Sequence, residues 1–467
     1  MSSAIYGDKR VDNLKIAYIG GGSRGWAWGL MSDLAAAGDL SGCVDLYDID
    51  FEAAKANEVI GNKFNDLPEA VGKWTYTAKR TIGEALTGAD FVIISILPGT
   101  FDEMESDVHH PEKYGIYQPV GDSTGPGGII RALRTIPMFR EIARAVRDYC
   151  PKAYVINYTN PMTLAVAALY KEFPEIRAFG CCHEVFGTKY LITRMLKEHR
   201  GLTVQREELV SNVIGVNHFT WLTDLTLHGE DLFPFYAEAI EKQEAKLNEE
   251  LALVDNNWVK IAGSTHDRVK YDLFKRYGVM AAAGDRHLAE FCEGSWYLES
   301  PEMVQKWGYS LTTVKWRKED LEKRLARSAR LQSGEEAVKI SNTGEEGVKQ
   351  MRALLGLCDL VTNVNLPNVG QIPNLPMGAV VETNATFTAG GVRPVMAGPV
   401  PPQILNLIAR ISAEQQMVLE GAFEHDLDKV FAAFCNDPLV RLPLAEARKM
   451  FDEMIENTKG YLTEYFE

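Results

Sequence analysis

Three short segments of the sequence carry residue types that could perform chemistry. GCCHE contains Cys182 and His183, GVNHF contains His218, and AAAGDRH contains Asp285. A thiol and an imidazole are metal ligands, and a carboxylate can act as a general base. Each also has an ordinary structural explanation, because buried cysteine is usually a small core hydrophobe and an aspartate before a helical stretch can cap it. Residue type alone leaves both explanations open.

A glycine cluster near the N-terminus has the spacing of a dinucleotide-binding turn. IGGGSRG follows an apolar run and precedes a helical pattern, and the strand-like segment CVDLYDI carries Asp48 next to its last residue. Such glycines let the backbone approach a pyrophosphate, while an acid after the second strand binds ribose hydroxyls and favours NAD over NADP. Asp48 is the expected acid, with Asp45 and Asp50 as competitors, and a glycine-rich turn without a ligand is the alternative. The residues expected to bind the cofactor are therefore Gly20, Gly22, Ser23, Arg24, Gly25 and Asp48.

Two further polar segments follow the same kind of pattern. NYTNPM ends a strand-like run, and its Asn160 could hold a sugar hydroxyl or the nicotinamide ribose. VGDSTGPGG (120–128) is a polar, glycine-rich loop before a helical stretch, and it could either close over the cofactor or form a plain turn.

These residues need a scaffold, and the first 200 residues predict one. Short apolar runs alternate with amphipathic stretches, which is typical of a parallel, doubly wound sheet. After residue 200 the pattern changes to a β-rich segment (209–229), charged helical stretches (235–260 and 314–340) and an Asn-, Pro- and Gly-rich segment (365–387). Amphipathic helical stretches follow at 402–422 and 439–466. We expect an α/β protein with an N-terminal Rossmann-like domain (1–200), similar to lactate and malate dehydrogenases, and a C-terminal α+β domain (201–467).

Composition narrows the classes of partner. The formal net charge of −15 argues against nucleic acid and anionic membranes, since both need a basic face. Seven dispersed cysteines do not resemble a disulfide framework and indicate a reducing cytoplasm. The first residues show no apolar signal-peptide core, and the longest apolar runs are too short to span a bilayer.

Taken together, the motifs resemble glycoside hydrolase family 4, the glycosidases that depend on NAD and a divalent metal. The matching segments run in order through IGGGSRG, LYDID, GDSTGPGG, NYTNPM, GCCHE, GVNHF, YGVMAAAGD and NLPNVGQIPNLP. The resemblance implies that Cys182 and His218 bind the metal, usually Mn²⁺, although a thiolate ligand by itself would suggest zinc. It also implies homodimers or homotetramers.

The resemblance further implies a route by oxidation and elimination. NAD-dependent oxidation at sugar C3 acidifies the C2 proton, a base removes it, and the glycosidic oxygen leaves while the metal stabilises the charge. Asp285 matches the position of the base in a subset of the family. His183 lies where some relatives carry an acid that assists the leaving group, so its role could be acid catalysis or contact to the sugar O2 and O3.

Within the family, the CHE triplet is similar to members that act on α-linked uronic acids. We therefore expect a small-molecule uronide substrate, either a galacturonide or a glucuronide. Arg286 and His287, and also Arg393, could bind its carboxylate, with a surface ion pair as the alternative for each. The alternatives for function are an α-galactosidase or α-glucosidase of the same family, an NAD-dependent hydroxy-acid dehydrogenase, and a non-catalytic sensor of NAD or sugar.

Overall fold

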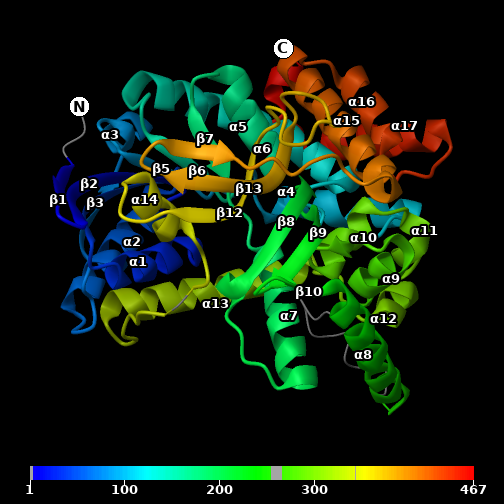
Figure 1. Ribbon diagram of the computed structural model, residues 1–467. Coiled ribbons are helices and arrows are strands. Elements are labelled where there is room, and N and C mark those ends of the chain that lie inside the picture. The colour runs from blue at the N-terminus through cyan, green and yellow to red at the C-terminus, as the bar shows by residue number, and fades with distance from the viewer. Residues whose placement is uncertain (1–3, 254–265, 342, 467) are drawn as a thin grey trace.

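The computed structural model describes residues 4–253, 266–341 and 343–466. Its main sheet contains β4(Lys73–Lys79), β3(Leu40–Tyr47), β2(Arg10–Ile19), β5(Phe91–Ile94), β6(Tyr154–Asn157) and β7(Arg177–Gly180), side by side in that order and all parallel. This order is the doubly wound arrangement with its reversal of direction next to β2. The short strand β1(Ile5–Gly7) pairs with β2 at its N-terminal end. The expected Rossmann-like α/β fold is confirmed (Figure 1).

Helices cover both faces of this sheet, which explains why the strands are continuous apolar runs. The first core cluster joins the sheet to α5(Gly125–Tyr149) and α6(Met162–Glu172), together with α3(Ile82–Leu86). The second core cluster, on the other face, joins it to α1(Trp26–Ala36) and α2(Phe51–Lys63). The short helix α4(Phe101–His109) packs against α5.

The second half of the chain extends the first sheet. β12(Leu360–Pro367) pairs antiparallel with β7, and β13(Val380–Thr388) and β14(Gly391–Pro394) follow it outward. These strands lie in the segment that the sequence assigned to a separate C-terminal domain. The predicted division at residue 200 therefore does not fall at an edge of the sheet. It does fall at the end of a helix, because α7(Glu184–Arg200) ends there and Gly201 is its C-cap.

The remaining residues form a smaller sheet and a helical layer. β8(Leu209–Val216) and β9(Phe219–Leu227) make a hairpin, and β9 also pairs with β10(Glu230–Asp231) and β11(Met280–Ala281). The helices near this sheet are α8(Phe233–Leu253), α9(Arg268–Tyr277), α10(Asp285–Phe291), α11(Gly294–Tyr297) and α12(Pro301–Trp307). Residues 254–260 of the predicted charged stretch lie outside the described residues.

One long helix and one short helix lie beside the N-terminal part of the chain. The long helix α13(Val314–Ser333) lies against α2 and α4, and the short helix α14(Gly347–Leu354) packs beside α1 (Figure 1). The C-terminal helices α15(Pro402–Glu424), α16(Leu427–Asn436) and α17(Leu444–Thr458) lie against α5. No helix in the described parts of the chain has the length and apolar character needed to cross a membrane.

Candidate active site

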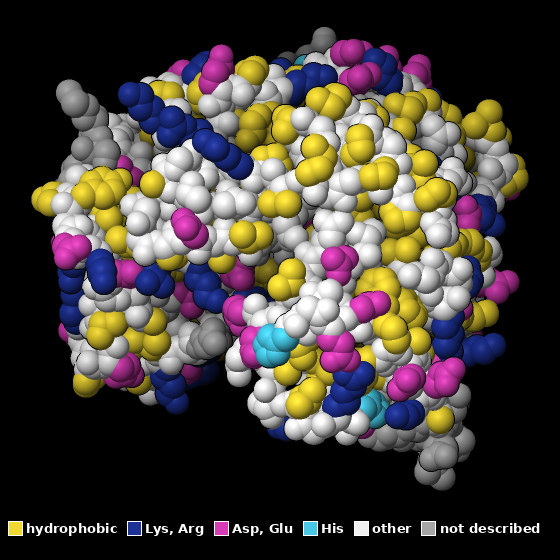
Figure 2. Space-filling model, in the orientation of Figure 1, with side chains coloured by type: hydrophobic (Ala, Val, Ile, Leu, Met, Phe, Trp, Pro, Cys, Tyr) yellow, Lys and Arg dark blue, Asp and Glu magenta, His cyan; other side chains and the backbone are white. Residues whose placement is uncertain are grey.

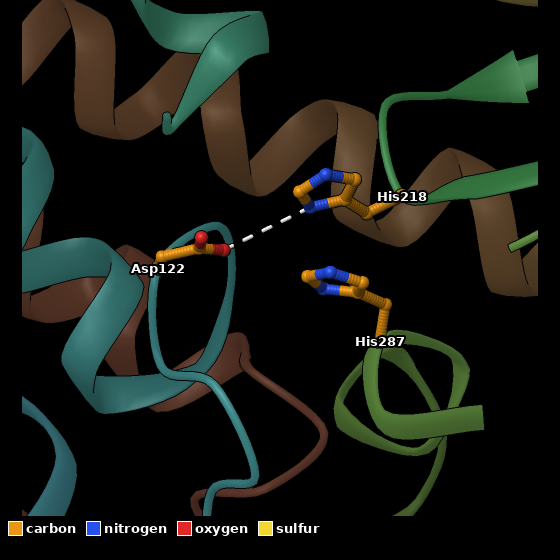
Figure 3. Close-up of side chains that lie close together, drawn as sticks. All are labelled: Asp122, His218 and His287. Atoms are coloured by element: carbon orange, nitrogen blue, oxygen red, sulfur yellow. Dashed lines mark ion pairs between the residues drawn. The ribbon is translucent and has the colours of Figure 1, made fainter. Parts of the chain in front are cut away.

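Three side chains from different elements meet beside the carboxyl ends of the parallel strands. Asp122 comes from the loop before α5, His218 from the β8–β9 turn and His287 from α10. One ligand atom of each lies within 4.8 Å of the others, and Figure 3 shows the two imidazoles beside each other and facing the carboxylate. The His218 and His287 rings are stacked with centroids 3.7 Å apart, and His218 Nδ1 lies 3.8 Å from Asp122 Oδ1.

The local backbone explains why His218 points into this site. Val216, the last residue of β8, pairs with Phe219, the first residue of β9, so Asn217 and His218 form a two-residue turn. His218 has a φ of 64°, in the left-handed region, as the second central residue of the turn. Its Nδ1 lies 2.9 Å from Ser123 Oγ, which fixes the ring orientation.

The charge states of His218 and Asp122 suit a cation. Burial and the neighbouring His287 lower the pKa of His218 to about 3, so its imidazole is neutral. Burial opposes ionisation of Asp122, but the imidazoles and Arg131 hold the pKa of its carboxyl well below the usual range. Neutral imidazoles and an ionised carboxylate are the forms that bind metals. His287 Nδ1 is buried without a hydrogen-bond partner, as expected for an atom that a ligand would complete.

Cys182 does not belong to this three-residue group. Its side chain is buried, and burial together with the Glu382 and Glu184 carboxylates raises the pKa of its thiol well above the ordinary value. A metal would have to displace that proton. The ligand pair expected from the sequence is therefore divided: His218 lies in the group, and Cys182 lies near Asn217, which also hydrogen-bonds Glu382.

Glu184, the carboxylate of GCCHE, lies between two of the expected residues, His183 and His287. Its Oε2 accepts a hydrogen bond from Gly284 N at 2.6 Å, and its Oε1 lies 3.8 Å from His287 Nε2 and 3.9 Å from His183 Nε2. His183 itself is more than half exposed, lies 3.4 Å from Glu345 and contacts the ring of Trp26 at the start of α1. It is thus at the mouth of the site, and the Glu345 carboxylate raises its pKa.

Asp285 has a structural partner that the sequence did not indicate. Its fully buried carboxylate accepts hydrogen bonds from the Val269 and Lys270 amides, at 3.2 and 3.1 Å. These amides belong to the first turn of α9, so Asp285 caps α9 rather than its own helix, whose N-cap is Gly284. Burial and Asp267 raise the pKa of Asp285. Both carboxylate oxygens are occupied, and the role of base stays a prediction.

Asn160 lies where the sequence placed it, at the end of β6 and beside the three-residue group. Its Nδ2 donates to Asp122 Oδ2 at 3.1 Å, and its backbone oxygen accepts from Arg131 Nε at 3.2 Å. Its Oδ1 is buried without a partner, which leaves an acceptor for a hydroxyl group. Arg286, beside His287, hydrogen-bonds Thr312. Arg393 is exposed on the edge strand β14 and lies outside this group.

The glycine turn has the geometry expected for a dinucleotide site. Gly20 has a φ of 86°, and an added Cβ there would lie 2.1 Å from Ser95 O. Gly22 N donates to Asp48 Oδ2 at 2.8 Å, so the acid at the end of β3 is tied to the turn. Arg24 pairs with Asp50 at 3.7 Å, and Gly25 is the N-cap of α1. The turn thus has an acid at its edge, and the Arg324 guanidinium lies beside it, donating to Arg24 O at 2.9 Å.

Sequence reasoning missed Asp122, the buried Arg131 and the partly buried Arg317. Asp122 was part of the polar loop 120–128, but only its contact with His218 identifies it as a possible ligand. Arg131 lies inside an apolar helix, where the sequence gives no sign of a site. Arg317 lies in a charged stretch that is typical of a solvated helix face.

Comparison with known proteins agrees with this architecture. The family model for family 4 glycosyl hydrolases matches residues 15–198, and the model for the C-terminal domain of family 4 glycosyl hydrolases matches residues 213–440. The chain therefore belongs to the family 4 glycosyl hydrolases.

Individual relatives are similar over nearly their whole length. The chain is 57% identical over 459 residues to a protein named alpha-galacturonidase from Thermoanaerobacterium saccharolyticum, covering 98% of each chain. It is 52% identical over 458 residues to an alpha-galacturonidase from Thermoanaerobacter italicus, covering 98% of this chain and 99% of that protein. A crystal structure of a putative glucosidase lplD from Bacillus subtilis superposes with a TM-score of 0.87 at 48% identity, covering 95% of this chain and all of that one.

Proposed function

We propose that this protein is an α-galacturonidase that releases galacturonic acid from α-linked galacturonides. The observation that carries the proposal is the 57% identity, over 98% of both chains, to a protein of that name. The site supports it independently, because a group suited to a cation lies next to a glycine turn suited to a dinucleotide. Net hydrolysis with a recycled cofactor needs both.

NAD and a divalent metal, Mn²⁺ in our proposal, would be the cofactors. They would supply reversible oxidation of the sugar and stabilisation of negative charge on its oxygens. We assign the metal to Asp122, His218 and His287, with Cys182 at the border of the site. One carboxylate and two imidazoles suit manganese better than a thiolate does, and three protein ligands leave positions open for sugar hydroxyls.

The other side chains would bind the cofactor and the sugar and move protons. The glycine turn would receive the pyrophosphate at the start of α1, and Asp48 the ribose. Asn160 would accept a hydrogen bond from a sugar hydroxyl through its unpartnered Oδ1. Asp285 is the proposed base for the C2 proton, and exposed His183 the proposed donor to the leaving oxygen.

The same proposal covers location and assembly. All seven cysteines are free, which suits a reducing cytoplasm. A homodimer or homotetramer is proposed, and gel filtration with light scattering would measure its mass. On the face shown in Figure 2, acidic and basic side chains are interspersed, with one short row of Lys and Arg at the upper left.

The test is a panel of p-nitrophenyl α-galacturonide, α-glucuronide, α-galactoside and α-glucoside, assayed with NAD, Mn²⁺ and a thiol reductant. We expect the galacturonide to be hydrolysed fastest, with no net NADH at 340 nm. Faster hydrolysis of a neutral hexoside would reject the galacturonide as the preferred substrate, but it would agree with NAD- and metal-dependent glycoside hydrolysis. Net NADH formation from a hydroxy acid, without hydrolysis of any glycoside, would reject the proposed function.

A further inference from the structure

Three arginines from three different helices converge on the loop that carries Asp122. Arg131 belongs to α5, Arg286 to α10 and Arg317 to α13. Arg131 donates to the backbone oxygen of Asn160, and the Asn160 side-chain amide donates to Asp122. Arg286 donates to the Thr312 hydroxyl, and the Thr312 backbone N–H donates to Pro119 O, at 3.0 Å, in the segment that leads to Asp122. Arg317 Nε is buried and has no hydrogen-bond partner.

These guanidinium groups lack their own counter-ions. Within the described ranges, no carboxylate lies within 4.0 Å of any of the three. Burial is the main cause that lowers the pKa of Arg317 and of Arg131, and the Asp122 carboxylate counteracts it at both. Arg286 adds to the lowering at Arg317, and Arg317 adds to it at Arg131. Arg131 is buried and the other two are partly buried, so holding these like charges together without an ion pair is costly and suits the cluster to an anion.

The carboxylates that face this cluster do not neutralise it. Asp122 carries one negative charge, which a bound metal would share. Glu290 is fully buried, and its Oε1 already accepts hydrogen bonds from the Val120 and Gly121 amides at 2.7 and 2.8 Å. Burial raises the pKa of Glu290 to about 8, so it stays largely neutral at pH 7. The cluster therefore keeps an excess of positive charge beside the metal ligands.

We infer that Arg131, Arg286 and Arg317 form the subsite that binds the carboxylate of the uronide, with Arg317 as its specificity-determining residue. This inference rests on the proposed function. A planar guanidinium matches a carboxylate in a bidentate fork, and a neutral hexoside has only a hydroxymethyl group at that position. The cluster adjoins Asp122 and His287, so a sugar bound by its ring hydroxyls at the metal can place its carboxylate among the arginines. Arg393, on the exposed edge strand, is not part of it.

The test compares Arg317→Gln and Arg286→Gln with Arg327→Gln in the protein loaded with NAD and Mn²⁺. Arg327 lies on the same helix, but its half-exposed side chain pairs with Glu336 at 2.8 Å, so it is a matched control. A hydrogen bond to a charged group contributes about 1.5–3 kcal/mol. KM for the α-galacturonide should therefore rise about 10- to 100-fold in Arg317→Gln, with kcat changed far less. The KM of Arg317→Lys should lie between those of the wild type and Arg317→Gln, and the KM of Arg327→Gln should match that of the wild type.

The outcomes separate this inference from the proposed function. If the wild type hydrolyses the galacturonide and neither Arg317→Gln nor Arg286→Gln raises KM, the subsite is overturned while the function stands. If the wild type hydrolyses only neutral hexosides, free D-galacturonate becomes the probe, as an inhibitor of that reaction. Inhibition that Arg317→Gln weakens about 10-fold or more would keep the subsite, whereas absence of inhibition in the wild type would overturn it as well.

Discussion

At the scale of single residues, the site depends on where a side chain is held. Cys182 and His218 are both plausible ligands by type, but only the imidazole lies within reach of two other possible ligands, Asp122 and His287. The hairpin turn decides this, since it directs His218 toward the loop that carries Asp122. His218 is therefore the ligand common to the set implied by the family resemblance and the set that the geometry brings together.

The first prediction concerns this ligand set. His218→Ala should lower Mn²⁺ affinity by at least about 100-fold, because loss of a direct ligand should exceed the 10- to 100-fold cost of losing a ligand's outer-shell partner. His287→Ala and Asp122→Asn should each weaken binding as well. Metal content after dialysis and calorimetric titration measure this. Unchanged Mn²⁺ affinity in His287→Ala would show that His287 is not a metal ligand. A loss of Mn²⁺ affinity in Cys182→Ser would add the Cys182 thiol to the ligands.

The second prediction separates two roles of Asp285. Asp285→Asn keeps one acceptor but leaves an amide of α9 without its partner, so the free energy of unfolding should fall by about 1–3 kcal/mol. If Asp285 is also the base, kcat of the folded variant should fall about 10²–10⁴-fold. Urea unfolding and kcat per folded molecule measure the two effects. An unchanged kcat beside lowered stability would leave only the capping role.

At the scale of elements, the sequence predicted what depends on local patterns. The strands β2 to β7, the helices between them and the glycine turn follow from apolar periodicity and glycine spacing. The extension of the sheet by β12, β13 and β14 did not, because pairing between segments almost 200 residues apart leaves no local signal. Asp122 and Arg317 were missed for the same reason: their significance lies in partners from other elements.

The third prediction tests the glycine turn. A Cβ added at Gly22 would lie 2.5 Å from the Ala53 Cβ and 2.8 Å from Asp48 Oδ2, so Gly22→Ala must push the turn away from Asp48. NAD affinity should fall at least about 10-fold, and stability by about 1–3 kcal/mol. Gly187→Ala is the control, because an added Cβ in that exposed turn of α7 meets nothing within 4 Å and alanine favours a helix. Calorimetric titration with NAD compares Gly22→Ala with Gly187→Ala. Equal NAD affinity in the two variants would contradict the assignment of the glycine turn as the NAD site.

At the scale of the whole molecule, the proposed metal site joins distant parts of the chain. Asp122 precedes α5 of the doubly wound sheet, whereas His218 and His287 belong to the smaller sheet and its helical layer. α13, which lies against α2 and α4, carries Arg317 of the proposed carboxylate subsite. The chemistry therefore depends on their relative placement, and a ligand that binds all three segments stabilises that placement.

The last prediction follows from this linkage. A metal that binds only the folded protein stabilises it by about 2.7 kcal/mol at a free concentration 100 times its Kd. Mn²⁺ should therefore raise the free energy of unfolding of the wild type, and a chelator should reverse the gain. In Asp122→Asn the gain should shrink sharply, because a neutral amide replaces the ionised ligand, while the stabilisation by NAD should persist. Urea unfolding with and without each ligand measures both gains. If the variant keeps the full gain from Mn²⁺, the metal does not bridge these segments through Asp122.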